Sequence, residues 1–371
     1  MTKERQKVLF VTGGVFPHSV GGMERHSACL IRALADTGSV DIHVVHPHDR
    51  RVFESDSDIH EIPVPFDFNG FYLKKCYEYS ILTDKLIRKH TDALVYAQGL
   101  SVIHGLNKTG NRVIVNPHGL EPFQGLSFSE KLKTYPFRKL ERYQFKHAAR
   151  VVSLGGRLTD ILSKEMKKRT DRIVTLPNAV EPVPPIDRNF EGSVIKLLFV
   201  GRFAFNKGIN ILMEAMRQLN KEGYEKRIEL HLVGKGPLFD TYTKEYNLPN
   251  TIFHGFTDDE QLNRLYEQCD LFVFPTLFEG MPTVVLEAMV RGLPVVVSDT
   301  GATAELTDSS TGFLIEANNI RALKWAVQQF YQLPPEQKKM LSIASRRKVM
   351  ERFTWKQVAA KHLELFSTFR P

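Results

Sequence analysis

The feature that most constrains the fold of this chain is an alternation of compact apolar runs with helical patterns, which occurs twice. Each apolar run is followed by a stretch in which apolar residues recur at helical spacing. Such alternation predicts parallel strands joined by helices on both faces of a sheet. In the first part of the chain the predicted strands are residues 7–12, 40–46, 93–97, 112–115, 150–154 and 172–176.

A second alternation of the same design follows a proline-rich stretch. Residues 177–192 carry prolines and charges with little periodicity, which is typical of an interdomain linker. The second set of strands is predicted at 194–201, 227–234, 251–253, 271–275 and 294–298, with helices near 208–220, 238–246, 259–268 and 283–291. Because 371 residues exceed what one core usually supports, two domains are expected.

We therefore predict an α/β protein with two Rossmann-like parallel-sheet domains, residues 1–185 and 186–352, facing an interdomain ligand cleft. Residues 353–371 form a separate C-terminal segment, predicted to be an amphipathic helix. Its apolar positions recur at helical spacing and are expected to pack a core rather than bind a ligand. They are Trp355, Val358, Ala359, His362, Leu363 and Phe366.

The formal net charge of +8 points to an anionic partner, for which phosphorylated ligands, nucleic acid and anionic membranes are the ordinary candidates. Residues 131–150 interleave basic side chains with aromatic and aliphatic ones. This pattern is typical of a helix on an anionic membrane surface and equally of a solvated helix face. No nucleic-acid partner is expected, because no recognisable binding motif accompanies the charge.

The cysteines and the amino-terminal residues bear on the compartment. Cys29, Cys76 and Cys269 are few and far apart, so neither a disulfide framework nor a zinc cluster is indicated. The first residues lead into a strand without the layout of a secretory signal, and no apolar run is long enough to cross a bilayer. We expect a cytoplasmic protein, with residues 131–150 as a route to the inner face of the cell membrane.

Glycine pairs follow the first predicted strand. Gly13-Gly14 ends that strand, and Gly21-Gly22 precedes a helical pattern over residues 24–36. The spacing does not fit the G-x-G-x-x-G fingerprint, so a hydride-carrying dinucleotide cofactor is not supported. Glycines allow close approach of the backbone to a ligand, and a plain flexible loop is the alternative interpretation.

A histidine follows the predicted strand at 112–115. It belongs to the segment Asn116-Pro117-His118-Gly119, which lies at the carboxyl edge where open α/β sheets bind ligands. Lone histidines are more often structural than catalytic. The strand-end position and the flanking proline and glycine nevertheless favour a binding role for His118.

The loop after the first strand of the second half carries two cations. Arg202 and Lys207 lie between Gly201 and Gly208, just before a predicted helix. Basic residues are not favoured at a helix start unless an anion is present. Arg202 can hold a phosphate with two parallel hydrogen bonds, and Lys207 can add a mobile point charge.

The chemistry is predicted to centre on residues 275–289. A loop ends near Met281 and a helix begins, with Pro282 expected in its first turn. The helix is apolar around most of its circumference, which predicts that it is buried. Its start offers unpaired amides and a partial positive charge to an anion such as a diphosphate. Glu279 precedes this start and Glu287 lies inside the helix, where a sugar ring can supply the donors that its carboxylate needs.

These motifs together resemble the signature of the retaining glycosyltransferases of family 4, which have a GT-B fold. The resemblance rests on Gly201-Arg202 with Lys207-Gly208, and on Glu279-Gly280-Met281-Pro282 with Glu287-Ala288-Met289. It covers almost the whole chain, because residues 21–26 resemble the family's glycine loop, residues 117–119 its active-site histidine, and Gly301 with Glu305 its turn after a strand. These motifs are specific for the reaction class and weak for the sugar.

The resemblance implies roles for the residues of the second half. Arg202 and Lys207 would bind the diphosphate of a nucleotide-sugar donor, and Glu287 would bind the ribose hydroxyls. Glu279 would contact the transferred sugar. The remaining donor contacts would come from residues 280–283. The backbone amides of Gly280, Met281 and Thr283 would lie near the sugar and the phosphates, and Pro282 would line the same loop.

It also implies roles for the first half. His118 would lie by the anomeric centre, and Gly22 would let the amino-terminal loop approach the diphosphate. The helix from Thr354 would cross back onto the first domain. Many family members carry Gly-Gly where this chain has Gly301-Ala302, which leaves the contact to the donor sugar less secure.

The expected reaction is metal-independent transfer with retention. Cleavage of the anomeric C–O bond leaves negative charge on the diphosphate, which cations and helix amides stabilise without a metal ion. Asp56-Ser57-Asp58 fits the letters of a metal motif but lies in a polar stretch before a strand, and we interpret it as surface. No cofactor is expected beyond the donor, for which a UDP-sugar is favoured over a GDP-sugar by analogy.

The expected acceptor is a hydroxyl of a glycan or a lipid-linked glycan in the synthesis of cell-surface polysaccharide or glycoconjugate. Two alternatives remain at this point. One is a GT-B epimerase that acts on a nucleotide sugar without an acceptor. The other is a non-catalytic protein that binds a membrane surface through residues 131–150.

Overall fold

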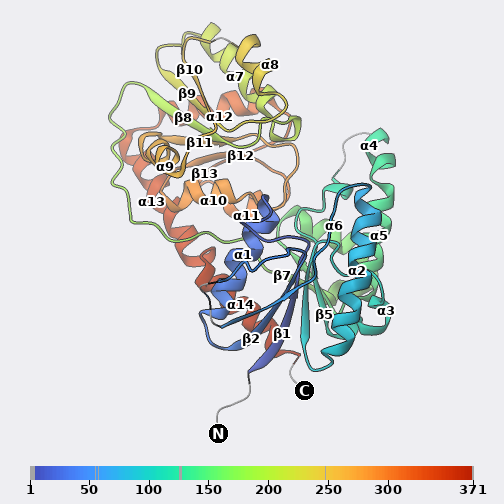
Figure 1. Cartoon of the computed structure of the whole chain (residues 1–371). Coiled ribbons are helices and arrows are strands. Elements are labelled where there is room, and N and C mark those ends of the chain that lie inside the picture. The colour runs from blue at the N-terminus through green and yellow to red at the C-terminus, as the bar shows by residue number, and fades with distance from the viewer. Residues whose placement is uncertain (1–4, 55, 57, 125–127, 247, 370–371) are drawn as a thin grey trace. The chain divides into compact units, whose positions relative to one another are not determined.

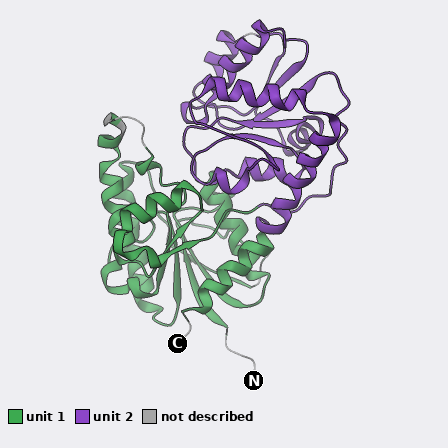
Figure 2. Ribbon diagram, turned by 180° about the vertical axis from the view of Figure 1, so that it is seen from behind, with its two compact units in different colours: residues 1–179, 355–371 green, residues 180–354 purple. Residues whose placement is uncertain are grey.

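The computed structural model describes residues 5–54, 56, 58–124, 128–246 and 248–369 (Figure 1). The chain divides into two compact units, which Figure 2 shows in different colours. Unit 1 comprises residues 1–179 with 355–371, and unit 2 comprises residues 180–354. Each unit contains one parallel sheet covered by helices, so each is described by itself.

The sheet of unit 1 has the strand order β3-β2-β1-β4-β5-β6-β7, and all its pairs are parallel. The strands are β1 (Gln6–Val11), β2 (Val40–His46), β3 (Ile59–Pro63), β4 (Leu94–Gln98), β5 (Val113–Asn116), β6 (Arg150–Ser153) and β7 (Ile173–Thr175). The main helices are α1 (Gly22–Ala35), α2 (Tyr72–Lys89), α3 (Leu106–Thr109), α4 (Phe128–Lys133), α5 (Tyr135–His147), α6 (Arg157–Met166) and α14 (Trp355–Ser367).

Central strands of this sheet are buried along their length, because helices cover both faces. Every residue of β4 and β5 is buried, whereas only Ile59 is buried in the edge strand β3. In Figure 1, α1 and α14 lie on one side of the sheet and α2 and α5 on the other. Continuous apolar runs are what a parallel strand with two covered faces requires.

The sheet of unit 2 has the order β10-β9-β8-β11-β12-β13, again with parallel pairs only. Its strands are β8 (Ile195–Val200), β9 (Ile228–Val233), β10 (Thr251–Gly255), β11 (Leu271–Phe274), β12 (Val295–Ser298) and β13 (Gly312–Ile315). Its helices are α7 (Ile209–Lys221), α8 (Phe239–Glu245), α9 (Asp259–Gln268), α10 (Thr283–Val290), α11 (Thr303–Leu306), α12 (Ile320–Gln332) and α13 (Pro335–Arg352).

The prediction of two Rossmann-like parallel sheets is confirmed, but two strands were missed, β3 in unit 1 and β13 in unit 2. Each forms an edge of its sheet, and β13 directly follows a polar turn. Only the two end residues of β13 are buried, whereas its neighbour β12 is buried along its whole length. A four-residue edge strand of this kind has too little apolar periodicity to be recognised from sequence.

The prediction of one helix across residues 131–150 is wrong. The stretch divides at Thr134 into α4 and α5, and Arg150 already begins β6. Pro136 lies in the first turn of α5, where its missing amide cannot continue a helix from the preceding turn. None of the helices among the described residues has the length and apolar character needed to cross a membrane.

The proline-rich stretch after β7 is fixed to unit 2 by a buried arginine. Arg188 donates hydrogen bonds to the carbonyls of Tyr266, Glu267, Cys269 and Arg291, around the ends of α9 and α10. The side chain therefore caps carbonyls that the two helices leave unpaired. Burial lowers the pKa of Arg188 to about 10, so it stays charged at neutral pH.

The last helix, α14, completes the core of unit 1. It packs against α1, and Phe366 is fully buried with its ring 5.8 Å from that of Tyr96. Trp355, Val358 and Ala359 are buried in the same cluster. The C-terminal residues thus return to the sheet built by the first part of the chain.

Phe366→Ala should destabilise the protein by about 3–5 kcal/mol, because it opens a cavity in a packed core. Urea denaturation measures this loss. Lys361→Ala changes an exposed residue of the same helix and serves as the control, with an expected change within about 0.5 kcal/mol. Equal effects of the two substitutions would contradict the assignment of α14 to the core.

Candidate functional site

In unit 2 the predicted site residues come together where the neighbouring strands β8 and β11 end. The loop after β8 contains a short 3-10 turn, η4 (Phe205–Lys207). The carbonyl of Asn206 accepts hydrogen bonds from the Thr276 hydroxyl at 2.9 Å and from the Leu277 amide at 2.8 Å. These two bonds join the loop after β8 to the loop after β11. Lys207 is therefore held beside the residues that precede α10.

Gly208 allows this close approach. Its φ is +69°, and a Cβ added there would lie 1.8 Å from the carbonyl oxygen of Pro275. Any other residue would force the two loops apart. Gly208 is also the N-cap of α7, and no side chain caps that helix start.

Lys207 and Glu279 form an ion pair between their Nζ and Oε1 atoms. Both side chains are largely buried, with exposed fractions of 22% and 15%. The Lys207 ammonium also lies 5.7 Å from the centroid of the Phe274 ring. The sequence predicted the lysine for phosphate and the glutamate for sugar, and the structure brings the two into direct contact.

Arg202 differs from Lys207 in having no such partner. Its side chain is exposed and makes no ion pair or hydrogen bond within the described ranges of the chain. The loop after β8 therefore presents one paired and one unpaired cation.

The helix α10 begins at Thr283, with Pro282 as its N-cap rather than inside its first turn as predicted. No side chain caps this start, so its first amides are open to an anion. Met281 is 3% exposed and Thr283 is half-buried. The prediction of a buried apolar helix is confirmed, because five of its eight residues are buried. They are Val285, Leu286, Ala288, Met289 and Val290.

The turn after β12 supports the loop that contains Glu279. Gly301 has a φ of +51°, and a Cβ added there would lie 2.2 Å from the carbonyl oxygen of Glu279 and 2.3 Å from that of Gly280. The Ala302 amide donates to the Gly280 carbonyl at 2.8 Å. Ala302 is fully buried, so its methyl group is accommodated where many family members carry a second glycine.

Glu287 is held by a tyrosine that the sequence analysis did not identify. The Tyr266 hydroxyl donates to Glu287 Oε2 at 3.2 Å. Burial, and then the Glu287 charge, raise the pKa of Tyr266 well above its usual value, so the hydroxyl stays protonated as a donor. Arg291 lies 4.8 Å above the Tyr266 ring and donates to the Glu287 carbonyl. Glu287 is half-buried, and these contacts orient its carboxylate and its backbone.

In unit 1 the candidate site is at the carboxyl end of β5, where His118 adopts a left-handed backbone conformation. Its φ is +62°, which is uncommon for a residue other than glycine. Asn116 Oδ1 accepts a hydrogen bond from the His118 amide at 3.0 Å and stabilises this turn. The strand-end position predicted for His118 is thus found, together with backbone strain that often accompanies function.

A chain of hydrogen bonds joins this turn to α14. His362 Nδ1 donates to the Val358 carbonyl at 2.8 Å, which leaves Nε2 to accept from the Tyr96 hydroxyl at 3.0 Å. Tyr96 in turn accepts from Asn116 Nδ2 at 3.2 Å. Because a carbonyl oxygen can only accept, the bond to Val358 fixes the His362 tautomer and with it the direction of the chain.

His118 is a neutral imidazole with one defined donor. Its Nε2 contacts Gln98 Oε1, and with the Gln98 amide in this orientation Nε2 carries the proton and Nδ1 remains an acceptor. Burial lowers the pKa of His118 to about 4. Gln98 is the last residue of β4 and follows the same strand-end rule as His118, so the sequence could have identified it.

His26 packs against His118 from α1. The two rings are 5.0 Å apart in a T-shaped arrangement, and the His26 ring lies 5.4 Å from that of Trp355. Burial lowers the pKa of His26 well below its usual value, with smaller effects of His118 and His362. The histidines of this cluster are therefore uncharged at neutral pH.

The glycine loop of unit 1 is anchored by another histidine. The Val15 amide donates to His48 Nε2 at 3.0 Å, and burial lowers the pKa of His48 to about 4. Gly22 begins α1, is exposed, and has open space where a side chain would lie. Asp56 of the Asp-Ser-Asp stretch pairs with Arg32 at 3.1 Å, and Ser57 lies outside the described residues.

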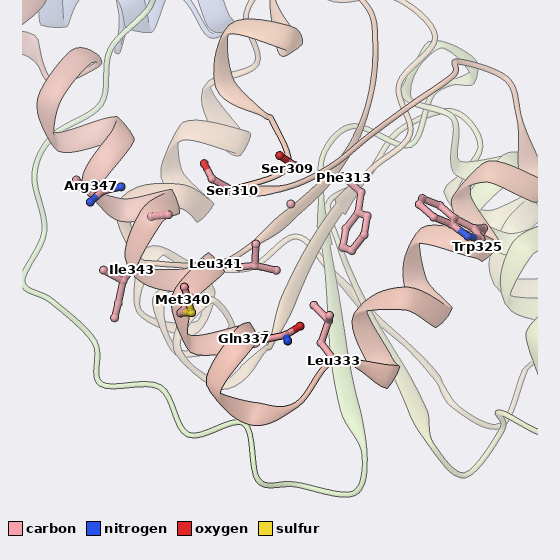
Figure 3. Close-up of a pocket in the computed structure, with 12 residues that line it drawn as sticks. Ser309, Ser310, Phe313, Trp325, Leu333, Gln337, Met340, Leu341, Ile343 and Arg347 are labelled. Carbon is pink, nitrogen blue, oxygen red and sulfur yellow. The ribbon is translucent and has the colours of Figure 1, made fainter.

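A separate apolar cavity of about 690 Å³ lies between β13, α12 and α13 (Figure 3). Phe313 and Trp325 form part of its wall, with ring centroids 5.9 Å apart. The predicted site residues are not among those that line it. Its size therefore does not make it the candidate active site.

The two sheets and their strand-end loops define a two-domain α/β protein of the Rossmann type. Residues 20–183 match the family described as Glycosyltransferase Family 4, and residues 186–347 match Glycosyl transferases group 1. Because these two matches together cover most of the chain, the protein belongs to this glycosyltransferase family.

One curated relative is the putative colanic acid biosynthesis glycosyltransferase WcaL of Salmonella typhimurium. It is 26% identical over 188 residues, which cover 48% of this chain and 46% of the relative. The matched stretch spans less than half the length of several curated relatives.

Solved structures share the fold over nearly the whole chain. Sucrose-phosphate synthase from Thermosynechococcus elongatus matches with a TM-score of 0.76 at 21% identity, covering 98% of this chain and 99% of that one. The Anabaena protein HepE in complex with UDP matches with a TM-score of 0.69 at 17% identity, covering 98% and 100%. The fold is accordingly GT-B.

Tyr96→Phe should destabilise the protein by about 1–3 kcal/mol, because His362 and Asn116 would lose their partner in a buried site. We expect lower turnover as well, since the His118 turn depends on Asn116. Tyr79→Phe removes another buried hydroxyl, which donates to the Thr12 carbonyl at 2.9 Å, and serves as the control. Its stability should fall without a comparable loss of turnover. Unchanged turnover in Tyr96→Phe would contradict the role of the hydrogen-bond chain.

Acidification should destabilise unit 1 between about pH 6.5 and pH 4. Burial lowers the pKa of His118 and His362 to about 4, so the folded state binds fewer protons than the unfolded state in this range. The stability is fully present above the unfolded pKa of about 6.5 and is lost as the pH falls. Each histidine should cost about 2 kcal/mol between pH 7 and pH 5.

Urea denaturation at the two pH values measures this loss. His362→Gln keeps an acceptor for Tyr96 but cannot take up a proton, so the pH-dependent loss should shrink in this variant. The same pH dependence in variant and wild type would contradict the assignment.

Proposed function

We propose that the protein transfers a sugar, with retention, from a nucleotide-diphosphate sugar to a hydroxyl of a glycan or lipid-linked glycan. The observation that carries this proposal is the joined pair of loops in unit 2. They present Arg202, Lys207 and Glu279 beside the uncapped start of α10.

Departure of the diphosphate is the step that these groups would assist. Negative charge develops on the leaving oxygen as the anomeric C–O bond breaks. Arg202 would bind the diphosphate with its free guanidinium, and Lys207 would turn from Glu279 toward the phosphates. The amides of Gly280, Met281 and Thr283 would add fixed donors, and such preorganised groups lower the barrier without reorganisation.

The two glutamates would serve different parts of the donor. Glu279, released from Lys207, would accept hydrogen bonds from the sugar hydroxyls. Glu287, oriented by Tyr266, would accept those of the ribose. A UDP-sugar is the favoured donor, which the likeness in fold to a protein solved with UDP supports as an analogy.

His118 would act on the sugar through Nδ1, its remaining acceptor. A neutral imidazole can accept a hydrogen bond from a sugar hydroxyl without adding a second positive charge near an oxocarbenium-like centre. The acceptor hydroxyl would attack from the face that the diphosphate leaves, and a departing phosphate oxygen would take its proton. Gly22 would let the amino-terminal loop approach that phosphate.

Arg202→Ala and Lys207→Ala should each lower kcat by about 10²–10³-fold, because each removes a cation from the leaving group. A coupled assay of nucleoside diphosphate release measures this effect. Lys221→Ala, at the exposed end of α7, is the matched control. Near-normal turnover in both active-site variants would contradict the leaving-group assignment.

The same assay separates this reaction from epimerisation or hydrolysis. Donor should be consumed only when an acceptor is present, and activity should persist after treatment with a chelator. A panel of nucleotide sugars, screened by thermal stabilisation, identifies the donor. Consumption without acceptor, or loss of activity on chelation, would contradict the corresponding part of the proposal.

We also propose that the acceptor lies at an anionic membrane surface, which the protein contacts through α4 and α5. Leu132 is 67% exposed and Tyr135 is 53% exposed, beside exposed lysines. Glu141, in contrast, is buried, and burial followed by the charge of Glu121 raises its pKa to about 8. The exposed face therefore keeps its positive charge. A relative named for colanic acid biosynthesis supports a polysaccharide acceptor.

Lys139→Glu with Lys146→Glu should weaken binding to vesicles that contain anionic lipid, and added salt should weaken wild-type binding. Arg142 is left unchanged, because Glu165 engages it at 2.6 Å. Lys221→Glu reverses one charge in unit 2 and is the control. Equal vesicle binding by the double variant and wild type would overturn the membrane contact.

A further inference from the structure

We propose that Asp41, His43 and His60 form a binding site for one divalent transition-metal ion, of the zinc type. The three residues lie on β2 and β3, at the edge of the sheet in unit 1. The proposed transfer reaction does not involve them.

The strand register places the three side chains on one face. His43 and His60 are directly opposite each other in the β2–β3 pairing. Asp41 lies two residues before His43 on the same strand, and side chains two residues apart share a face. Three ligating groups are thus brought together by backbone hydrogen bonds rather than by a loop.

Distances between the ligand atoms fit a single ion. His43 Nε2 lies 2.9 Å from Asp41 Oδ2, and His60 Nε2 lies 3.4 Å from Asp41 Oδ1. One ligand atom from each residue lies within 4.8 Å of the others. Ligands around a tetrahedral zinc ion, each about 2.0–2.2 Å from it, are separated by similar distances. An ion would take the place of the imidazole protons that now face the carboxylate.

The donor set indicates the kind of ion. Two imidazole nitrogens and one carboxylate oxygen suit zinc, cobalt, nickel or copper, whereas calcium and magnesium prefer oxygen ligands. His90 lies close by, with its ring 6.0 Å from that of His43, and could provide a further ligand after a side-chain rotation. Otherwise water would complete the coordination.

Neighbouring cations do not block the site. Lys7, which lies near His90, is paired with Asp92 at 3.1 Å. Arg112 donates to the carbonyls of Ile87, His90 and Ala93. The side chains of His43, Asp41 and His60 are 17%, 33% and 59% exposed, so an ion can enter from solvent.

A bound ion would fasten the edge strand β3 to β2. An edge strand has a neighbour on one side only, and only Ile59 of β3 is buried. In the strand register Asp41 lies opposite Lys7, near the amino end of the parallel sheet, whereas His118 follows the carboxyl end of β5. The ion would therefore stabilise unit 1 at the end of the sheet opposite to His118. It would take no part in sugar transfer.

Calorimetric titration of Zn²⁺ into chelator-treated protein without a polyhistidine tag tests the proposal. Co²⁺ provides a second probe, because its visible absorption reports coordination by imidazole. Wild type should bind one equivalent and gain thermal stability. His60→Gln and Asp41→Asn should each weaken binding by about 10–100-fold and lose that gain.

His104→Gln is the matched control. It removes a histidine whose side chain is 42% exposed and which lies near Asp84, away from Asp41, His43 and His60. It should bind Zn²⁺ as wild type does. The proposal is overturned if wild type shows no saturable binding of one equivalent. It is also overturned if His60→Gln and Asp41→Asn bind as wild type does, which would indicate adventitious binding by other histidines.

Discussion

The geometry of the candidate donor site depends on two hydrogen bonds to one carbonyl group, that of Asn206. They join the loop after β8 to the loop after β11, and they require Gly208 because a side chain there would meet the Pro275 carbonyl. Lys207 consequently stands against Glu279, and both stand before the uncapped start of α10. In this ion pair the positive charge of Lys207 and the negative charge of Glu279 compensate each other. An anionic diphosphate would compete for the lysine and release the glutamate for the sugar.

In unit 1 the structure holds the strained turn at His118 and keeps the His118 imidazole uncharged. The left-handed conformation of His118 is fixed through Asn116, and Asn116 is tied by Tyr96 to His362 on the last helix. The C-terminal helix is thus part of the support of the turn as well as of the core. Burial keeps the imidazole groups neutral, so they serve as directional donors and acceptors rather than as charges.

Much of this could be predicted from sequence because strand ends carry a simple signal. Apolar runs followed by glycine and helical spacing predicted every strand of the two sheets except the edge strands β3 and β13. The strand-end rule predicted the positions of His118, Arg202 and Lys207. What could not be predicted depends on contacts between distant residues. Tyr266 beside Glu287 and His362 beside Tyr96 look like core residues in the sequence, and the pairing of Lys207 with Glu279 joins groups that were assigned separate ligands. The break at Thr134 was missed because charge and aromatic periodicity outweighed the signal of Pro136.

Titration calorimetry of UDP against wild type and Glu279→Gln tests the central claim most directly. If the diphosphate draws Lys207 away from Glu279, removal of the glutamate charge frees the lysine in advance. Glu279→Gln should then bind UDP at least as tightly as wild type while losing sugar transfer. The account would be contradicted if Glu279→Gln bound UDP more weakly than wild type does. It would also be contradicted if wild type bound neither UDP nor any other nucleoside diphosphate.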